Sequence, residues 1–383
     1  MEYKNNNLYI NNNNILDFLT QTPVHIYSKQ YIISQFKIIQ NKSNNLIYYA
    51  VKANFNPEII KIIISLGGGF DCVSQGEINH VINCGADINK IIFSGVGKTE
   101  QELEFAIKTK IKQISCESIE EVDEIIEISR RLQIKANIAL RTNLDIKTTT
   151  HKHISTGAKT DKFGIDYTKI ILICDKIKTE KYINFIGLTT HIGSQILDIN
   201  NFKIAFNQFE KVIEAVQDAG HKLECVSIGG GLGVIYKTNE REITQEYLQL
   251  IEDFKIKIKL PIILEPGRFL VANSCVTIAR VIRIKKTDDI NFLILNVGMN
   301  NIIGPALYGA YHHILPLIKH ENPTIQNYKI VGPICESSDI FHDNYQMQTM
   351  QKGDFVAILS TGAYCRSMAS NYNLMPIADE IFI

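Results

Sequence analysis

The chain has 383 residues, and its 40 basic side chains balance its 40 acidic ones. A neutral chain has no electrostatic footprint for nucleic acid or an anionic membrane, so we expect neither as a partner. The N-terminus lacks a signal-peptide pattern, and the longest isoleucine-rich run, Ile59–Leu66, is too short to span a bilayer. Eight cysteines without a CxxC pair argue against a zinc site or a disulfide scaffold, and we expect no metal. These features predict a cytoplasmic protein with reduced thiols.

Short apolar runs alternate with longer helical patterns from about residue 46, after an asparagine-rich N-terminus that predicts loops around one short strand. Strands that alternate with helices are typical of α/β proteins, and eight such strands predict a (β/α)8 barrel of the TIM type. Two of the helices are predicted at Ser118–Leu132 and Asn201–Ala219. The predicted strands are Leu46–Val51, Gly69–Val73, Ile91–Ser94, Gln113–Cys116, Ile134–Arg141, Asn184–His191, Glu224–Ile228 and Ile262–Glu265.

After Arg268 the pattern changes, because strand-like runs follow one another with few helices between them. This predicts a second domain, a mostly antiparallel β-sandwich or barrel that the N-terminal strand joins. We place the barrel domain at residues 30–270 and the β domain at residues 1–29 and 271–383. Strands predicted in the β domain are Cys275–Ile284, Phe292–Val297, Lys329–Val331 and Phe355–Leu359.

Polar residues gather where the barrel strands end, which is where barrel enzymes place their chemistry. Lys52 follows the first strand and could form an imine if the barrel mouth shields its amine from water, although a surface lysine would look the same. Asp71 stands near the end of the second strand. His191 ends the sixth, where it could be a core histidine or stack on a flat cofactor ring. Glu265 ends the eighth, where it could pair with Arg268 or keep the nitrogen of such a ring protonated.

Three consecutive glycines follow the seventh strand, within Gly229–Gly233. They could form only a tight turn. Glycine amides at a helix N-terminus also cradle phosphate, however, and the loops after strands seven and eight are the usual phosphate site of barrels. Two other phosphate motifs fail on spacing. A Rossmann fingerprint would need glycine where Val234 stands, and a P-loop ending at Thr99 would need glycine in place of Ile92.

In the second domain, the segment Gly332–Asp339 is dense in reactive residue types. A lone cysteine such as Cys335 is commonly a small buried hydrophobe, but beside Glu336 in a loop it could donate a proton. Near the C-terminus, Gly362–Tyr364 and Ser370–Asn373 bring aromatic and small residues together.

The order of these motifs over nearly the whole chain resembles that of the diaminopimelate decarboxylases, which belong to the alanine-racemase-like, fold-type III group of pyridoxal-phosphate (PLP) enzymes. The narrowest matches are PALYGAYHH (305–313) and CESSD (335–339). The other matching segments are YAVKAN (49–54), GFDCVSQGE (69–77), His153–Gly157, Lys162–Ile165, HIGSQ (191–195), SIGGGLG (227–233), EPGR (265–268), GMN (298–300), and GAY with MASNYN (within 362–373).

The resemblance implies PLP as the cofactor and an amino acid as the substrate. The implied catalytic residues are Lys52 as the Schiff-base lysine, Cys335 as the proton donor and His191 stacked on the ring. The other implied cofactor-binding residues are Asp71, Ser194, Gly230, Gly231, Glu265, Gly267, Arg268 and Tyr364. The implied substrate-binding residues are Arg268, Tyr308, Glu336 and Tyr364. The resemblance also implies a homodimer with shared active sites. The loop that carries Cys335 and Glu336, called the Cys-Glu loop, would complete the active site of the partner subunit.

The chain departs from the family pattern around the substrate. Gly304 stands where the family has an arginine that binds a substrate carboxylate, and Asn296 stands where it has an aspartate. Leu374 and Met375 occupy the stretch of another family arginine, and the chain ends soon after Glu380. The loss of one bidentate carboxylate contact typically costs about a few kcal/mol of binding free energy.

We therefore expect PLP-dependent decarboxylation of meso-2,6-diaminopimelate to L-lysine and CO2, the last step of lysine biosynthesis. Gly304 leaves open the same chemistry on a related amino acid, carboxynorspermidine or ornithine. A degenerate PLP-binding homologue without turnover is another alternative, against which the retained Lys52, His191, Glu265 and Cys335 argue. Alanine racemase chemistry fits less well, because a carboxyl group beside the ring nitrogen favours a strong electron sink.

Overall fold

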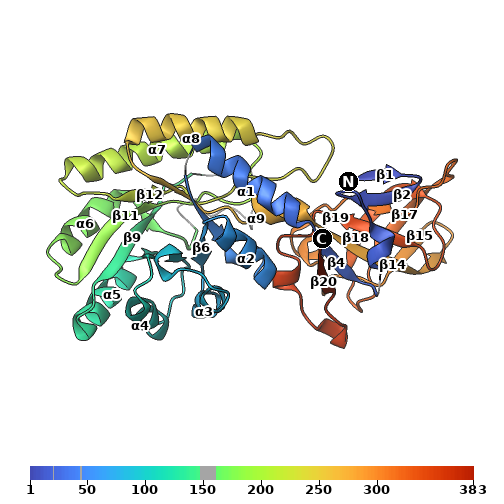
Figure 1. Cartoon of the computed structure of the whole chain (residues 1–383), viewed down its shortest axis with the longest axis horizontal. Helices are drawn as coiled ribbons and strands as arrows, with labels where there is room; N and C mark the ends of the chain where they lie inside the picture. Colours follow the sequence, from blue (N-terminus) through green and yellow to red (C-terminus); the bar gives the residue numbers. More distant parts are fainter. Residues whose placement is uncertain (20, 44, 147–160) are drawn as a thin grey trace. The chain divides into compact units, whose positions relative to one another are not determined.

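The computed structural model describes residues 1–19, 21–43, 45–146 and 161–383. Contacts within the chain divide it into two units, whose elements are labelled in Figure 1. The barrel unit contains residues 33–234 and 241–269, and the β unit contains residues 1–32, 235–240 and 270–383. The domain boundaries expected from the sequence, at residues 30 and 270, lie within a few residues of the unit boundaries at 33 and 269. The sequence-based boundaries differ in placing residues 235–240 in the barrel, whereas the contacts place them in the β unit.

Eight parallel strands close into a ring in the barrel unit, which confirms the predicted (β/α)8 barrel. The order around the ring is β9, β11, β12, β13, β5, β6, β7 and β8, and β8 pairs with β9 to close it. The strands are β5 (Leu46–Ala50), β6 (Gly69–Cys72), β7 (Ile91–Phe93), β8 (Gln113–Cys116), β9 (Ala136–Asn143), β11 (Ile183–Thr189), β12 (Cys225–Ser227) and β13 (Ile262–Leu264), with the short β10 (Ile165–Asp166) paired to β9.

The strands and helices of the barrel follow from burial. All residues of β6, β7 and β8 are buried, which is why these strands do not alternate between apolar and polar residues. Helix α5 begins after Ser118, whose hydroxyl accepts the Glu121 N–H, and it buries one stripe of apolar residues. The helices are α1 (Lys29–Ser43), α2 (Pro57–Ser65), α3 (Gln75–Asn83), α4 (Glu100–Thr109), α5 (Ile119–Leu132), α6 (Ile170–Lys178), α7 (Ile199–Asp218) and α8 (Thr244–Ile258). In the part of the chain that the structure describes, no helix has the length and apolarity that a membrane crossing requires.

A mixed sheet forms the β unit, in the order β16, β19, β14, β15, β17 and β18. Antiparallel pairs predominate, as predicted, but β15 pairs with β17 and β4 with β20 in parallel. The N-terminal β4 joins this sheet by pairing with β14, which the sequence also predicted. The elements are β4 (Val24–Tyr27), α9 (Arg268–Val271), β14 (Cys275–Lys286), β15 (Asn291–Leu295), α10 (Gly304–Tyr308), β16 (Ile314–Pro316), β17 (Ile325–Val331), β18 (Ile340–Gln348), β19 (Phe355–Leu359) and β20 (Asp379–Phe382).

The asparagine-rich N-terminus forms three strands, so the expectation of one short strand among loops was wrong. These are β1 (Glu2–Lys4), β2 (Asn7–Ile10) and β3 (Asn13–Asn14), which pair in antiparallel fashion. The two connections are Asn5–Asn6 and Asn11–Asn12, and all four residues have a positive φ. A two-residue hairpin turn needs this backbone conformation, and asparagine tolerates it better than most residues. The asparagines that predicted loops are therefore hairpin turns.

Candidate active site

Lys52 stands in a single 3-10 turn (Val51–Ala53) that continues β5 at the carboxyl end of the barrel strands. Its side chain is 42% exposed, and its Nζ lies 3.8 Å from Oδ2 of Asp71. Asp71 sits on the neighbouring strand β6, where Ala50 is its register partner. The Asp71 carboxylate is almost fully buried, and its Oδ1 has no hydrogen-bond partner among the described residues. A buried acceptor without a donor is uncommon in folded proteins, so this oxygen can still accept a hydrogen bond from a further donor.

Glu265 directly follows β13, and its Oε1 accepts a hydrogen bond of 2.6 Å from the Ser227 hydroxyl at the end of β12. Burial raises the pKa of Glu265 to about 7, and the nearby Asp71 carboxylate adds to the rise. The Ser227 hydrogen bond and the charges of Lys52 and Arg141 act in the opposite direction. Glu265 can therefore hold or release a proton near neutral pH.

His191 follows β11, and its Nδ1 accepts the N–H of Gly230 at 3.2 Å. This bond leaves the proton of the neutral ring on Nε2. Burial lowers the pKa of His191 well below its ordinary value, and the positive charges of Arg141 and Lys52 lower it further. The imidazole is therefore neutral at physiological pH, which suits a flat ring that stacks on another ring rather than one that carries charge.

The glycine loop after β12 is shaped by close backbone approaches. A Cβ on Gly230 would overlap the carbonyl oxygen of Glu265, and a Cβ on Gly231 would lie 2.7 Å from the carbonyl oxygen of Gly193. Gly229 and Gly231 also have φ values of +68° and +102°, which favour glycine. The loop therefore needs these glycines to lie against the segments after β11 and β13.

The remaining predicted cofactor residues of the barrel lie at the same end of the strands. Arg268 Nε donates to the Ser194 hydroxyl at 3.3 Å, which links the segments after β13 and β11. A Cβ on Gly267 would lie 3.1 Å from the Cβ of Ala53, so Gly267 lets the segment after β13 approach the turn that carries Lys52.

These barrel residues fit PLP. Lys52 supplies an amine beside a buried carboxylate whose second oxygen lacks a partner, and Glu265 supplies a carboxyl group that can hold a proton. His191 supplies a neutral flat ring, and the glycine loop after β12 supplies backbone amides without side chains. Fold and site together define a PLP-dependent barrel enzyme with a second, β-rich domain.

Four predicted site residues lie on the β unit. Cys335 and Glu336 are exposed neighbours in the loop between β17 and β18. Tyr308 ends α10, and Tyr364 lies after β19 with a φ of +60°. Cys335 and Glu336 are thus consecutive residues of one loop, whereas Tyr308 and Tyr364 belong to separate segments of the same unit.

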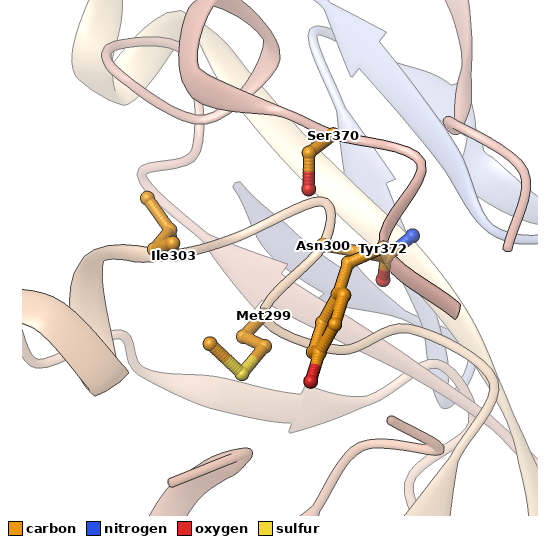
Figure 2. Close-up of a pocket in the computed structure, with 5 residues that line it drawn as sticks. All are labelled: Met299, Asn300, Ile303, Ser370 and Tyr372. Carbon is orange, nitrogen blue, oxygen red and sulfur yellow. The ribbon is translucent and has the colours of Figure 1, made fainter. Parts of the chain in front are cut away.

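A cavity of about 400 Å³ lies within the β unit (Figure 2). It lies between the segment after β15 and the segment after Tyr364, and its lining residues are Met299, Asn300, Ile303, Ser370 and Tyr372. Met299 also contacts the Cys-Glu loop, because its N–H donates to Asp339. The cavity is therefore next to the loop that carries Cys335.

The positions that depart from the family pattern also lie on the β unit. Gly304 begins α10, and a Cβ there would lie 3.2 Å from the Cβ of Ala310 and 3.8 Å from Nε2 of His312. Asn296 is structural, because its side chain accepts the Arg280 N–H and donates to the Thr22 hydroxyl. Leu374 is 92% exposed. The segment His153–Gly157, quoted for the resemblance, lies outside the described residues.

Sequence analysis missed three charged residues near the barrel mouth. Arg141, within β9, donates to Glu117 at 2.7 Å, and the second Glu117 oxygen accepts the Gly164 N–H. Burial raises the pKa of Glu77 to about 7, and its carboxyl group accepts the Val73 N–H. Arg141 stood at a predicted strand end, so the same rule could have found it. Glu117 directly follows the predicted strand Gln113–Cys116, so that rule could have found it too. Glu77 carried no such signal, because it lies near a helix start, where acidic residues are common.

Comparisons with known proteins agree with this class. Residues 29–272 match the family model described as "Pyridoxal-dependent decarboxylase, pyridoxal binding domain". Diaminopimelate decarboxylase of Aquifex aeolicus is 36% identical over 387 residues, covering 100% of this chain and 92% of that protein. The enzyme of Neisseria meningitidis serogroup B is 39% identical over 365 residues, covering 94% of this chain and 88% of that protein.

Solved structures give the same result. Helicobacter pylori diaminopimelate decarboxylase complexed with L-lysine matches with a TM-score of 0.92 and 36% identity, covering 96% of this chain and 93% of that one. The M. jannaschii enzyme in complex with L-lysine matches with a TM-score of 0.92 and 30% identity, covering 100% of this chain and 92% of that one. The chain belongs to the diaminopimelate decarboxylase family of PLP-dependent decarboxylases.

Proposed function

We propose that this chain decarboxylates meso-2,6-diaminopimelate to L-lysine and CO2 with PLP as its cofactor. The observation that carries the proposal is the group at the barrel mouth, where the Lys52 amine, two carboxyl groups and the neutral His191 ring lie together. Family membership supports the substrate, and the two structural relatives described above hold L-lysine, the product of this reaction.

When bound, PLP supplies an electron sink for the bond that breaks as CO2 leaves. Lys52 would attach the cofactor through its amine, and the Asp71 carboxylate 3.8 Å away would stabilise the charged form of that amine when the substrate displaces it. Glu265, with a pKa raised to about 7, would share a proton with the ring nitrogen. His191 would stack on the ring without adding charge.

The phosphate would be held by the glycine loop at Gly230 and Gly231 together with Ser194 and the segment Glu265–Arg268. The Gly230 N–H itself donates to His191 Nδ1, so Gly230 would contribute its lack of a side chain and Gly231 its backbone amide. The overlap that a Cβ on Gly230 would cause supports this role, because it shows that the glycine loop packs directly against the Glu265–Arg268 segment of the same cradle. The Ser194–Arg268 hydrogen bond would link the two sides of this cradle.

Cys335 would protonate the carbon that loses CO2, with Lys52 as the alternative donor. Four residues would hold the substrate: Arg268, Tyr308, Glu336 and Tyr364. The exposure of Cys335 and Glu336 on one loop supports their availability to a ligand.

The assembly would be a homodimer in which the Cys-Glu loop of one subunit completes the active site of the other, and its compartment would be the cytoplasm. The family resemblance supports the dimer. The cytoplasm is supported by the cysteine pattern, because all eight thiols are free in the structure.

A second candidate keeps the chemistry and changes the substrate to carboxynorspermidine or ornithine. The specific observation is Gly304, because no side chain can reach a distal carboxylate from this position. A PLP-binding homologue without turnover is the third candidate.

One assay separates these candidates. Purified protein with PLP is offered diaminopimelate, carboxynorspermidine and ornithine separately, while CO2 release is measured. We expect release from diaminopimelate, with L-lysine as the amino-acid product. Release from only one of the other two would favour the second candidate. No release from any of them, despite a bound-cofactor absorbance band, would favour the third.

A further inference from the structure

Asp339 is a buried carboxylate at the base of the Cys-Glu loop. Only 4% of its surface is exposed. Its Oδ2 accepts the N–H of Ile334 at 2.8 Å, and its Oδ1 accepts the N–H of Met299 at 2.7 Å. One carboxylate thus holds the residue just before Cys335 and the segment after β15 together, with one charge-assisted hydrogen bond to each.

Backbone bonds of Asp339 close the loop around the same point. Its carbonyl oxygen accepts the Gly332 N–H at 3.1 Å, and its N–H donates to the carbonyl oxygen of Glu336 at 3.1 Å. Cys335 and Glu336 therefore lie on a short span whose two ends are both tied to this one residue.

Two glycines make room for the carboxylate. A Cβ on Gly298 would lie 2.5 Å from Oδ2 of Asp339, and a Cβ on Gly332 would overlap the same oxygen. Neither glycine has the positive φ that would require glycine by itself. A Cβ on Gly332 would also lie 2.5 Å from the Cα of Gly298, so the small size of the two glycines is explained by the Asp339 carboxylate together with this close backbone approach.

Asn373 provides a second hold on the loop. Its side-chain oxygen accepts the Cys335 N–H at 2.8 Å, and its own backbone has a φ of +55°. The bond connects the loop to the exposed segment around Tyr372, which also lines the cavity of Figure 2.

We propose that Asp339 is a positioning residue for decarboxylation: it sets the place of the Cys335 thiol by holding both ends of the Cys-Glu loop, with Asn373 as a weaker second hold. This inference rests on the proposed role of Cys335 as the proton donor. Asp339 itself touches neither substrate nor cofactor in this role.

The first test compares Asp339→Asn with wild type as the PLP-loaded enzyme. Asparagine can accept only one of the two N–H groups and turns its own NH2 toward the other, so the loop loses its fixed place. We expect kcat for diaminopimelate to fall roughly tenfold to a hundredfold, while KM changes by less than about threefold. The cofactor absorbance band should remain. Asp343→Asn is the matched control, because Asp343 is an exposed aspartate on β18, and it should leave kcat unchanged.

The second test measures the solvent deuterium isotope effect on kcat. If proton delivery becomes slower, this isotope effect rises, whereas a loss of folded protein alone does not change it. We expect a rise in Asp339→Asn and in Cys335→Ala, and none in Asp343→Asn. Should Asp339→Asn fail to fold, Asn373→Gly serves instead, because glycine accepts the positive φ and removes only the side-chain acceptor. It should show a smaller change in the same direction.

The decisive comparison is the double variant Asp339→Asn with Cys335→Ala. If Asp339 acts through Cys335, the double variant has the kcat of Cys335→Ala alone. Multiplicative losses in the double variant, or an unchanged kcat in Asp339→Asn, would overturn the positioning role. An unchanged kcat in Cys335→Ala would instead overturn Cys335 as the donor, so the two failures are distinguishable.

Discussion

The barrel mouth and the Cys-Glu loop carry predicted site residues, but they are held in different ways. At the barrel mouth each side chain lies on a strand of one closed sheet or shortly after one: Asp71 lies on β6, beside Lys52 after β5. In the β unit, Cys335 and Glu336 are exposed on a loop. This loop is held by hydrogen bonds to one buried carboxylate, that of Asp339. The barrel residues thus depend on the whole sheet, whereas the loop residues depend on a few contacts.

This difference matches where the chain departs from its family. Gly304, Asn296, Leu374 and Met375 all belong to the β unit, and the motif residues at the barrel mouth are kept. A change in a loop or a short helix costs little when the barrel remains intact. In this chain the departures from the family pattern therefore lie in the β unit and not on the strands that carry the barrel-mouth residues.

The largest expected effect is that of Lys52→Ala. Loss of the amine removes the covalent attachment of PLP, so we expect activity to fall by about a thousandfold or more and the bound-cofactor absorbance band to disappear. The spectrum and CO2 release of the purified variant measure both. Lys61→Ala, on an exposed lysine of α2, is the control. A band that persists in Lys52→Ala would mean that another lysine holds the cofactor.

The second-largest loss of activity is expected for Glu265→Gln. The amide keeps the size of the side chain but cannot share an acidic proton with the ring nitrogen, so kcat should fall by about a hundredfold with the cofactor still bound. Steady-state kinetics and the absorbance spectrum separate the two effects. If kcat is unchanged while PLP is lost, Glu265 acts in binding and not in the chemistry.

Gly230→Ala tests the cradle. The added Cβ would overlap the Glu265 carbonyl oxygen, so the loop must shift, and we expect PLP to bind about tenfold more weakly. Gly97→Ala is the matched control in the same unit, because nothing lies within 4 Å of a Cβ there. Titration of the cofactor into apo-protein measures both affinities, and equal affinities would show that the phosphate is held elsewhere.

Gly304→Arg should have the smallest effect and addresses the β unit. The Cβ of the new side chain would lie 3.2 Å from the Cβ of Ala310, a tight contact that requires Ala310 to shift by a few tenths of an ångström. A shift of this size should leave the helix α10 in place. If the new guanidinium reaches a substrate carboxylate, KM for diaminopimelate should fall by up to about tenfold with little change in kcat. Gly304→Leu, which adds bulk without charge, is the control. An unchanged KM would mean that another group already binds that carboxylate.

Local patterns were enough to predict most of the barrel. The bounds predicted for β8 and β19 are those observed, and β9 and β11 are displaced by only about two residues, because strand periodicity and burial are encoded in consecutive residues. The N-terminal hairpins were missed, since Asn5–Asn6 and Asn11–Asn12 resemble loops until their turn geometry is known.

Partners across the fold could not be predicted in the same way. The strand-end rule indicated that Lys52 and Glu265 lie at one end of the barrel. Two other features depend on which strands become neighbours. These are the hydrogen bond from Arg141 to Glu117 and the burial of Glu77, which raises its pKa. Such pairings join residues far apart in the chain, and no spacing in the sequence encodes them.

The sequence by itself determined the barrel, the second β-rich domain and the family, because these depend on local periodicity and on short motifs in a fixed order. Only the tertiary structure decided that Glu265 has a carboxyl group with a pKa near 7, that His191 is neutral, and that the Asp339 carboxylate holds the Cys-Glu loop. Burial and neighbouring charges cause the first two, and hydrogen bonds cause the third. All of these arise only when distant segments pack together.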